Sequence, residues 1–310
     1  MLKDREARKA IKEMVSGRLL FDEPMSRHTS IGVGGPADLL AFPESIEELT
    51  GLISHLSKHN VPMVPVGNCT NLIVRDGGFR GAMISLKALQ KVELKCGERD
   101  IVFIVAEAGV LLSQVVDLAV REALSGVEFC AGIPGSIGGS VKMNAGAYGK
   151  ELKDIIKSVS VFNGGMEIED VGVEKLLFKY RDLMTPESAI ITGATLSLLR
   201  GEKREIKKKV SEILEIRKGK HPIEYRNAGS IFKNLSGYPA GRIIDELGMK
   251  GIRVGDAQVS EKHGNFIVNL GHATADDVIS LIEIIRHRVM DKRGIYLDTE
   301  VKIVGVGDNV

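Results

Sequence analysis

One segment of the sequence places a hydroxyl, an ammonium and an amide close together. Residues 225–234 include Ser230, Lys233 and Asn234, and Gly229 comes directly before the serine. A serine hydroxyl can give a proton to a strongly basic intermediate if its position is fixed, and a lysine beside an amide suits a diphosphate. The glycine allows the backbone to approach a ligand closely. From these residues alone, a turn serine that bonds to nearby backbone remains a competing interpretation.

Two further segments offer charged groups for the same chemistry. Arg181 has a planar guanidinium that fits a carboxylate, although a surface pair of Arg181 with Asp182 is the simpler interpretation. Glu300 lies in residues 295–303, which alternate like a strand. The alternation places Glu300 on the face opposite Leu297, and it leaves open whether that face meets a cleft or solvent.

Two glycine-rich loops suit an anionic ligand. Their small residues let backbone N–H groups converge on a diphosphate, and their Asn, Ser and Thr side chains add donors. No P-loop lysine follows either loop, and each loop taken singly could equally be a tight turn. The candidate ligand-binding residues of the first loop are Val66, Gly67, Asn68, Cys69, Thr70, Asn71 and Leu72. Those of the second are Pro134, Gly135, Ser136, Gly138, Gly139, Asn144, Ala145, Gly146 and Ala147.

Hydrophobic periodicity predicts the elements that must position these residues. A β-α-β unit is expected from a strand at 37–43, a helix capped by Ser45, and a strand at 61–66. Further strands are predicted at 101–106, 127–129, 158–162, 189–199 and 295–303. Helices are predicted at 111–123, from 206 onward, and from Thr274 to Gly294.

Several motifs together resemble a known family. Residues 227–234 are similar to the Asn-Ala-Gly-Ser-x-Phe-Lys-Asn signature of UDP-N-acetylenolpyruvoylglucosamine reductases. Residues 180–183 resemble that family's Tyr-Arg-Asp-Ser segment, with Leu183 in place of the serine. Residues 297–301 and 262–267 resemble its Leu-Glu-Pro-Glu-Val and Lys-His-Ala-Asn-Phe-Ile segments. The likeness runs from about residue 26 to 304, and one departure is Cys69, where the family usually has glycine.

The resemblance implies a reaction and assigns residues to it. Family members reduce UDP-N-acetylglucosamine enolpyruvate to UDP-N-acetylmuramate for bacterial cell-wall synthesis, with FAD as cofactor and NADPH as the hydride-donating cosubstrate. By this likeness Ser230 is the proton donor, with Arg181 and Glu300 as the other catalytic residues. Lys233 and Asn234 face the substrate, and the two glycine-rich loops hold FAD. No metal is implied, and the short spacing between residues 180 and 225 indicates the compact branch without a long substrate lid.

The fold class implied by the family is α+β. It combines a two-part FAD-binding module of the vanillyl-alcohol-oxidase-like type with a C-terminal α+β substrate domain. The expected parts are residues 1–88, 89–200 and 201–310, with the final strand returning to the active site. A length of 310 residues suits two or three domains.

Composition excludes several other classes. The net charge of +1 gives no field that would draw the chain to nucleic acid or to an anionic membrane. The three cysteines form no framework and no metal motif, and the charged N-terminus lacks a signal peptide. We therefore expect a cytoplasmic protein, and we expect it to be a monomer. The family resemblance implies roles in cell-wall biogenesis, cell shape and cell division. The alternatives are another FAD-dependent oxidoreductase of the same cofactor fold and a non-catalytic UDP-sugar-binding protein.

Overall fold

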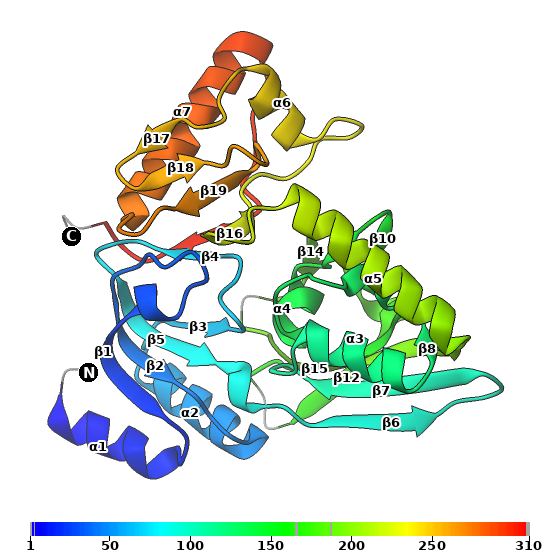
Figure 1. Ribbon diagram of the computed structural model, residues 1–310. Helices are drawn as coiled ribbons and strands as arrows, with labels where there is room; N and C mark the ends of the chain where they lie inside the picture. Colours follow the sequence, from blue (N-terminus) through cyan, green and yellow to red (C-terminus); the bar gives the residue numbers. More distant parts are fainter. Residues whose placement is uncertain (1, 3, 165–166, 187, 308–310) are drawn as a thin grey trace. The chain divides into compact units, whose positions relative to one another are not determined.

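The computed structural model describes residues 2, 4–164, 167–186 and 188–307. The chain divides into two compact units, each built from separated stretches. The first comprises Met1–Leu20, Leu40–Asn68 and Ala82–Arg217, and the second comprises Phe21–Leu39, Cys69–Gly81 and Lys218–Val310. Both units combine helices with sheets, which confirms the α+β class (Figure 1). The three-part division expected from the sequence stays a prediction.

The first unit contains a six-stranded antiparallel sheet (Figure 1). Its order is β12 (Ile168–Gly172), β11 (Ile156–Phe162), β15 (Ile190–Arg200), β7 (Ile101–Glu107) and β6 (Val92–Cys96), and β8 (Leu124–Ser125) also pairs with β15. Side chains alternate between the two faces of such a sheet. One face shares a buried apolar core with α3 (Leu112–Arg121) and α4 (Ile137–Lys142).

The predicted β-α-β unit is present near the start of the chain. Strands β1 (Leu19–Pro24), β2 (Pro36–Ala41), β5 (Phe79–Ser85) and β3 (Met63–Val66) form a sheet in that order. Helix α1 (Arg5–Met14) precedes it, and α2 (Ile46–Lys58) joins β2 to β3. Ser45 caps α2 by accepting from the Glu48 N–H. The apolar residues at helical spacing are all buried, namely Leu49, Leu52, Ile53 and Leu56. The sequence pattern therefore predicted this unit correctly.

The second unit has its own sheet and core. Strands β16 (Arg226–Ser230), β19 (Phe266–Asn269), β18 (Ala257–Val259) and β17 (Arg253–Val254) pair in that order. Helices α6 (Ala240–Glu246) and α7 (Ala275–Arg293) share the apolar core. Helix α7 has the predicted capping box of Thr274 and Asp277, and it ends at Gly294 with φ 67°.

Residues near the N-terminus complete this second unit. The Arg226 guanidinium donates to the carbonyls of Ser26, Thr29 and Ser30, at 3.3, 2.9 and 3.3 Å. The amide of Asn269 donates to the Ile31 carbonyl at 3.0 Å. Strand β4 (Leu72–Val74) pairs in parallel with β20 (Lys302–Val304). The serine strand β16 is thus held by segments almost 200 residues away in the sequence.

Helix α5 (Lys203–Lys220) confirms the helix predicted from residue 206 onward, although it begins a few residues earlier. The remaining elements are short. Strands β9 (Gly146–Ala147) and β10 (Lys150–Glu151) form one hairpin, and β13 (Leu177–Lys179) and β14 (Asp182–Met184) form another. The described part of the chain also has the 3₁₀ helices η1 to η5, at Met25–Arg27, Leu86–Ala88, Glu128–Cys130, Leu152–Asp154 and Val173–Lys175.

Two sequence-based strand predictions are wrong. Residues 127–129 form the N-cap and first part of the 3₁₀ helix Glu128–Cys130. Their backbone groups make local hydrogen bonds, such as that from the Cys130 N–H to the Val127 carbonyl at 2.9 Å, in place of strand pairing. The predicted strand at 295–303 is a strand only from Lys302, with a single bridge at Thr299. The reason is that the N–H groups of Glu300 and Val301 both point to the carbonyl of Ile231, which interrupts a regular ladder.

Candidate active site

Ser230 ends strand β16 of the second unit. Asn227 pairs with Val268 and Ser230 pairs with Phe266, with an irregularity between the two pairs. Gly229 lies in this irregular stretch with φ 74°, a conformation that glycine adopts without strain. The Asn227 side chain accepts from the Gly229 N–H at 3.0 Å. A glycine and a local side-chain bond therefore set the direction in which the chain carries Ser230.

Asn265 holds the residues that follow the serine. Its amide oxygen accepts from the Phe232 N–H at 2.9 Å, and its amide nitrogen donates to the Phe232 carbonyl at 2.8 Å. The Asn265 residue is only 3% exposed. A buried amide that satisfies both backbone groups of one residue replaces a pair of sheet hydrogen bonds. This contact fixes the backbone between Ser230 and Lys233.

The segment of Glu300 lies beside the segment of Ser230. The Glu300 N–H donates to the Ile231 carbonyl at 2.8 Å, and the Lys233 N–H donates to the Asp298 carbonyl at 2.8 Å. A bridge also joins Phe232 to Thr299. The structure thus brings together two of the three predicted catalytic segments through backbone pairing inside one unit.

Asn71 connects one of the glycine-rich loops to Glu300. Its side-chain amide donates to the Glu300 carbonyl at 3.0 Å, and its own carbonyl accepts from the Lys302 N–H at 3.0 Å. Both contacts lie inside the second unit. Asn71 therefore fixes the backbone of the candidate acid, in addition to its predicted contact with a cofactor.

The two predicted substrate-binding residues lie in the loop between β16 and α6. The Asn234 amide oxygen accepts from the Ala240 N–H at 3.0 Å, in the first turn of α6. Asn234 is exposed and Lys233 is half-buried. The loop thus presents a cation and an amide, which suit an anionic ligand.

Arg181 sits at the turn of the hairpin β13–β14 in the first unit. Lys179 pairs with Asp182, so Tyr180 and Arg181 form a two-residue turn. Arg181 has φ 59°, in the left-handed region that costs energy for a residue with a Cβ. Backbone strain of this kind is concentrated at functional sites. Ser230 and Glu300 belong to the second unit, so the convergence of Arg181 on them remains a prediction.

The glycine-rich loops of the first unit fit a diphosphate. Ser136 is 1% exposed, and its hydroxyl has no hydrogen-bond partner among the described residues. A Cβ added to Gly67 would lie 2.5 Å from the Ser136 oxygen, so a larger residue there would displace this hydroxyl. Gly135, directly before, has φ 143°. A buried hydroxyl without a protein partner, beside closely packed glycines, is compatible with a phosphate ligand.

Asn144 is engaged by the protein itself. It is fully buried, and its amide nitrogen donates to the carbonyl of Lys179 at 3.2 Å and to the Glu151 carboxylate at 3.0 Å. Its oxygen accepts from the Lys153 N–H at 3.1 Å. These contacts brace the Arg181 hairpin, and the predicted contact of Asn144 with the cofactor stays a prediction.

Cys69 belongs to the first glycine-rich loop, at the point where the chain passes from the first unit to the second. It is buried and has φ 51°. The cysteine thus adopts the left-handed conformation that the glycine usual in the family would adopt without strain.

Two residues near the site were missed by sequence reasoning. Lys142 at the end of α4 pairs with Asp182 at 3.0 Å. Arg217 lies against the second glycine-rich loop, where a Cβ on Gly132 would lie 2.9 Å from its side chain. Burial lowers the pKa of Arg217, and its hydrogen bond with Tyr148 opposes that shift. No sequence pattern links either residue to partners so distant along the chain.

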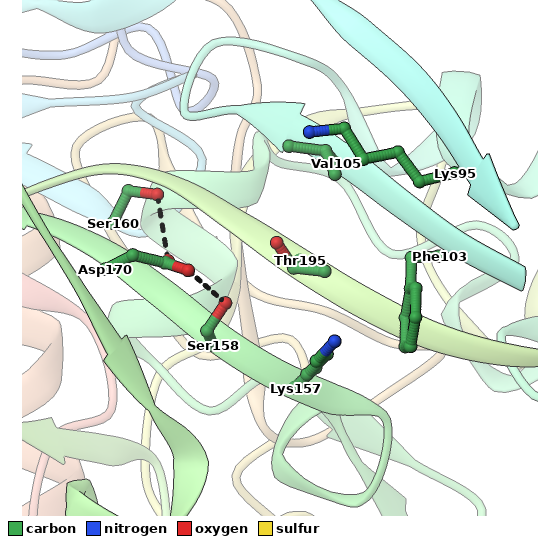
Figure 2. A pocket seen from close by; sticks show the side chains of 8 residues that line it. All are labelled: Lys95, Phe103, Val105, Lys157, Ser158, Ser160, Asp170 and Thr195. Carbon is green, nitrogen blue, oxygen red and sulfur yellow. Dashed lines mark hydrogen bonds between the residues drawn. The ribbon is translucent and has the colours of Figure 1, made fainter. Parts of the chain in front are cut away.

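A shallow hollow lies elsewhere, on the open face of the six-stranded sheet. Lys95, Phe103, Val105, Lys157, Ser158, Ser160, Asp170 and Thr195 line it. Figure 2 shows the hydroxyls of Ser158 and Ser160 directed to the Asp170 carboxylate, at 2.9 and 3.4 Å. None of the predicted catalytic residues lines this hollow, so it is separate from the candidate site.

The described residues lack two features that are typical of other protein classes. No group of three or more potential metal ligands occurs among the described residues. Within the same residues, no helix has the length and apolar character that crossing a membrane requires.

Known proteins resemble the chain over nearly its whole length. Residues 37–172 match the FAD binding domain family, and residues 221–304 match the family described as UDP-N-acetylenolpyruvoylglucosamine reductase, C-terminal domain. A UDP-N-acetylenolpyruvoylglucosamine reductase of Syntrophus aciditrophicus is 52% identical over 98% of both chains. One of Caldanaerobacter subterraneus is 44% identical over 95% of this chain and 97% of the relative. The crystal structure of the Thermus caldophilus reductase superposes with a TM-score of 0.78 at 37% identity, covering 93% of this chain and 98% of that one.

Proposed function

The chain belongs to the UDP-N-acetylenolpyruvoylglucosamine reductase family, and we propose that it converts UDP-N-acetylglucosamine enolpyruvate to UDP-N-acetylmuramate with NADPH as reductant. It is an FAD-dependent oxidoreductase, in keeping with its FAD binding domain. The observation that carries the residue assignment is the backbone pairing of the Ser230 and Glu300 segments, with Glu300 N–H to Ile231 carbonyl at 2.8 Å.

Reduction of the enolpyruvyl group requires a hydride at one alkene carbon and a proton at the other. When bound, FAD supplies the hydride from its N5 position. Ser230 gives the proton, since the intermediate is basic enough to take it from a fixed hydroxyl. Glu300, on the neighbouring segment, serves as the acidic partner of that transfer.

The substrate carboxylate needs a fixed cation. Arg181 fills this role, because its planar fork matches a carboxylate that gains charge during reduction. Lys233 and Asn234 bind the diphosphate of the sugar nucleotide. Ser136, with the loop around Gly67, holds the FAD phosphates, as its buried and unpartnered hydroxyl supports.

The cellular role follows from this activity. A cytoplasmic enzyme, acting as a monomer, would supply UDP-N-acetylmuramate for peptidoglycan synthesis, and thereby for cell shape and division.

The test separates the two half-reactions of the flavin. Ser230→Ala should leave flavin reduction by NADPH near normal, and it should slow flavin reoxidation by the enolpyruvyl substrate by about 10²–10⁴-fold. Ser236→Ala, an exposed serine of the same loop, is the control and should change neither rate. Equal loss of both half-reactions in Ser230→Ala would refute the proton-donor role. Failure of the wild-type reduced flavin to react with the substrate would refute the proposed activity.

A further inference from the structure

Lys142 contacts the Arg181 hairpin at three points. Its ammonium lies 3.0 Å from the Asp182 carboxylate and donates to the Leu183 carbonyl and to the Thr185 hydroxyl. We propose that Lys142 is a positioning residue that fixes the hairpin so that Arg181 meets the substrate carboxylate. This inference rests on the proposed function, since it concerns the part that Arg181 plays there.

The hairpin needs external support. Strands β13 and β14 have three residues each, and a two-stranded hairpin of this size is marginally stable by itself. Its turn also holds Arg181 at φ 59°, which adds strain. Leu183 is fully buried and Phe178 packs against the core, whereas Leu177 and Met184 are exposed. Apolar packing therefore anchors the hairpin at few points.

The polar anchors come from one end of one helix. Lys142 ends α4 and holds β14, and Asn144, two residues later, donates to the Lys179 carbonyl on β13. Both strands of the hairpin are thus attached to the same short segment. Ser136, at the other end of α4, belongs to the loop proposed to hold FAD. Helix α4 therefore connects the proposed cofactor loop to the proposed carboxylate-binding arginine inside one unit.

If Lys142 only stabilised the fold, its loss would lower the melting temperature and the flavin content. The positioning role predicts otherwise. The side chains of Lys142 and Asp182 are 42% and 32% exposed, and ion pairs this accessible contribute little to global stability. Loss of Lys142 should therefore leave the melting temperature and the flavin content almost unchanged. A change of position at Arg181, in contrast, affects catalysis strongly, because small displacements of a catalytic group cost large factors in rate.

The experiment uses the full chain loaded with FAD and compares Lys142→Met, Lys142→Arg and Lys150→Met. Lys150 is an exposed lysine of the nearby strand β10 and serves as the control. Lys142→Met should slow anaerobic flavin reoxidation by the enolpyruvyl substrate about tenfold, with flavin reduction by NADPH within about twofold of wild type. Lys142→Arg should retain most of the rate, because it keeps the cation. Lys150→Met should match wild type.

A double-variant comparison tests whether the effect passes through Arg181. In an Arg181→Lys background, the further change Lys142→Met should cost much less than tenfold. Full additivity would overturn the inference, and so would a parallel loss of flavin content and of both half-reactions in Lys142→Met. If Arg181→Lys itself leaves reoxidation unchanged, the role of Arg181 in the proposed function fails instead. If Arg181→Lys is impaired and Lys142→Met is not, only the inference fails.

Discussion

Replacing Asn265 by alanine should destabilise the backbone segment that follows Ser230. The change removes both partners of the buried Phe232 backbone, its N–H at 2.9 Å and its carbonyl at 2.8 Å. Each buried group left unsatisfied costs about 1–3 kcal/mol, so the two together cost about 2–6 kcal/mol. That loss is a large part of the total stability of about 5–15 kcal/mol typical of a domain.

The assay combines urea unfolding with the two flavin half-reactions. Asn265→Ala should lower the free energy of unfolding by about 2–6 kcal/mol and slow reoxidation by substrate more than reduction by NADPH. Asn265→Asp should also be impaired, since its second oxygen would face the Phe232 carbonyl. Asn163→Ala, at an exposed position, should stay within about 0.5 kcal/mol of wild type. An Asn265→Ala protein as stable as Asn163→Ala would refute the reasoning.

Two further predictions concern the cofactor loop and the pH dependence of stability. Gly67→Ala should lower the bound flavin content, because its Cβ would lie 2.5 Å from the Ser136 oxygen, whereas Gly51→Ala in α2 has open space and should keep full flavin content. Equal flavin content in both variants, read from absorbance, would contradict the close approach of the two loops. Burial lowers the pKa of His263 from its ordinary 6.5. The unfolded chain then binds more protons than the folded one below about pH 6.5, so the free energy of unfolding should fall as the pH drops through that value. His263→Gln should flatten this slope in denaturant titrations, and an unchanged slope would show that another group is responsible.

Local sequence signals correctly predicted helices whose capping residues lie next to them in the sequence. Helix α7 begins at Thr274 and ends at Gly294 as expected, because capping and the left-handed glycine act over a few residues. These features depend on neighbours in the sequence, which a single chain displays directly.

The rest depends on partners that are remote along the chain. The alternation of residues 295–303 indicated a regular strand, but the backbone of Glu300 instead meets Ile231 and Asn71. Lys142 gave no signal because its partner Asp182 is 40 residues away and defines the contact only after folding. At Cys69 the sequence departs from the family, and the structure shows a cysteine at φ 51° in place of a glycine. Whether a residue with a Cβ can adopt this left-handed conformation depends on the tertiary contacts around it, which the sequence does not reveal.

The hydrogen bonds from Arg226 to the carbonyls of Ser26, Thr29 and Ser30 have a consequence for folding during protein synthesis. Residues 26–30 are synthesised early, and about 200 further residues must be added before Arg226 is available to bind them. Closing a loop of this length is entropically costly, and topologies dominated by such remote pairings fold slowly. A fragment limited to residues 221–304 would lack these carbonyls altogether, so we expect it to be insoluble or unfolded when expressed alone.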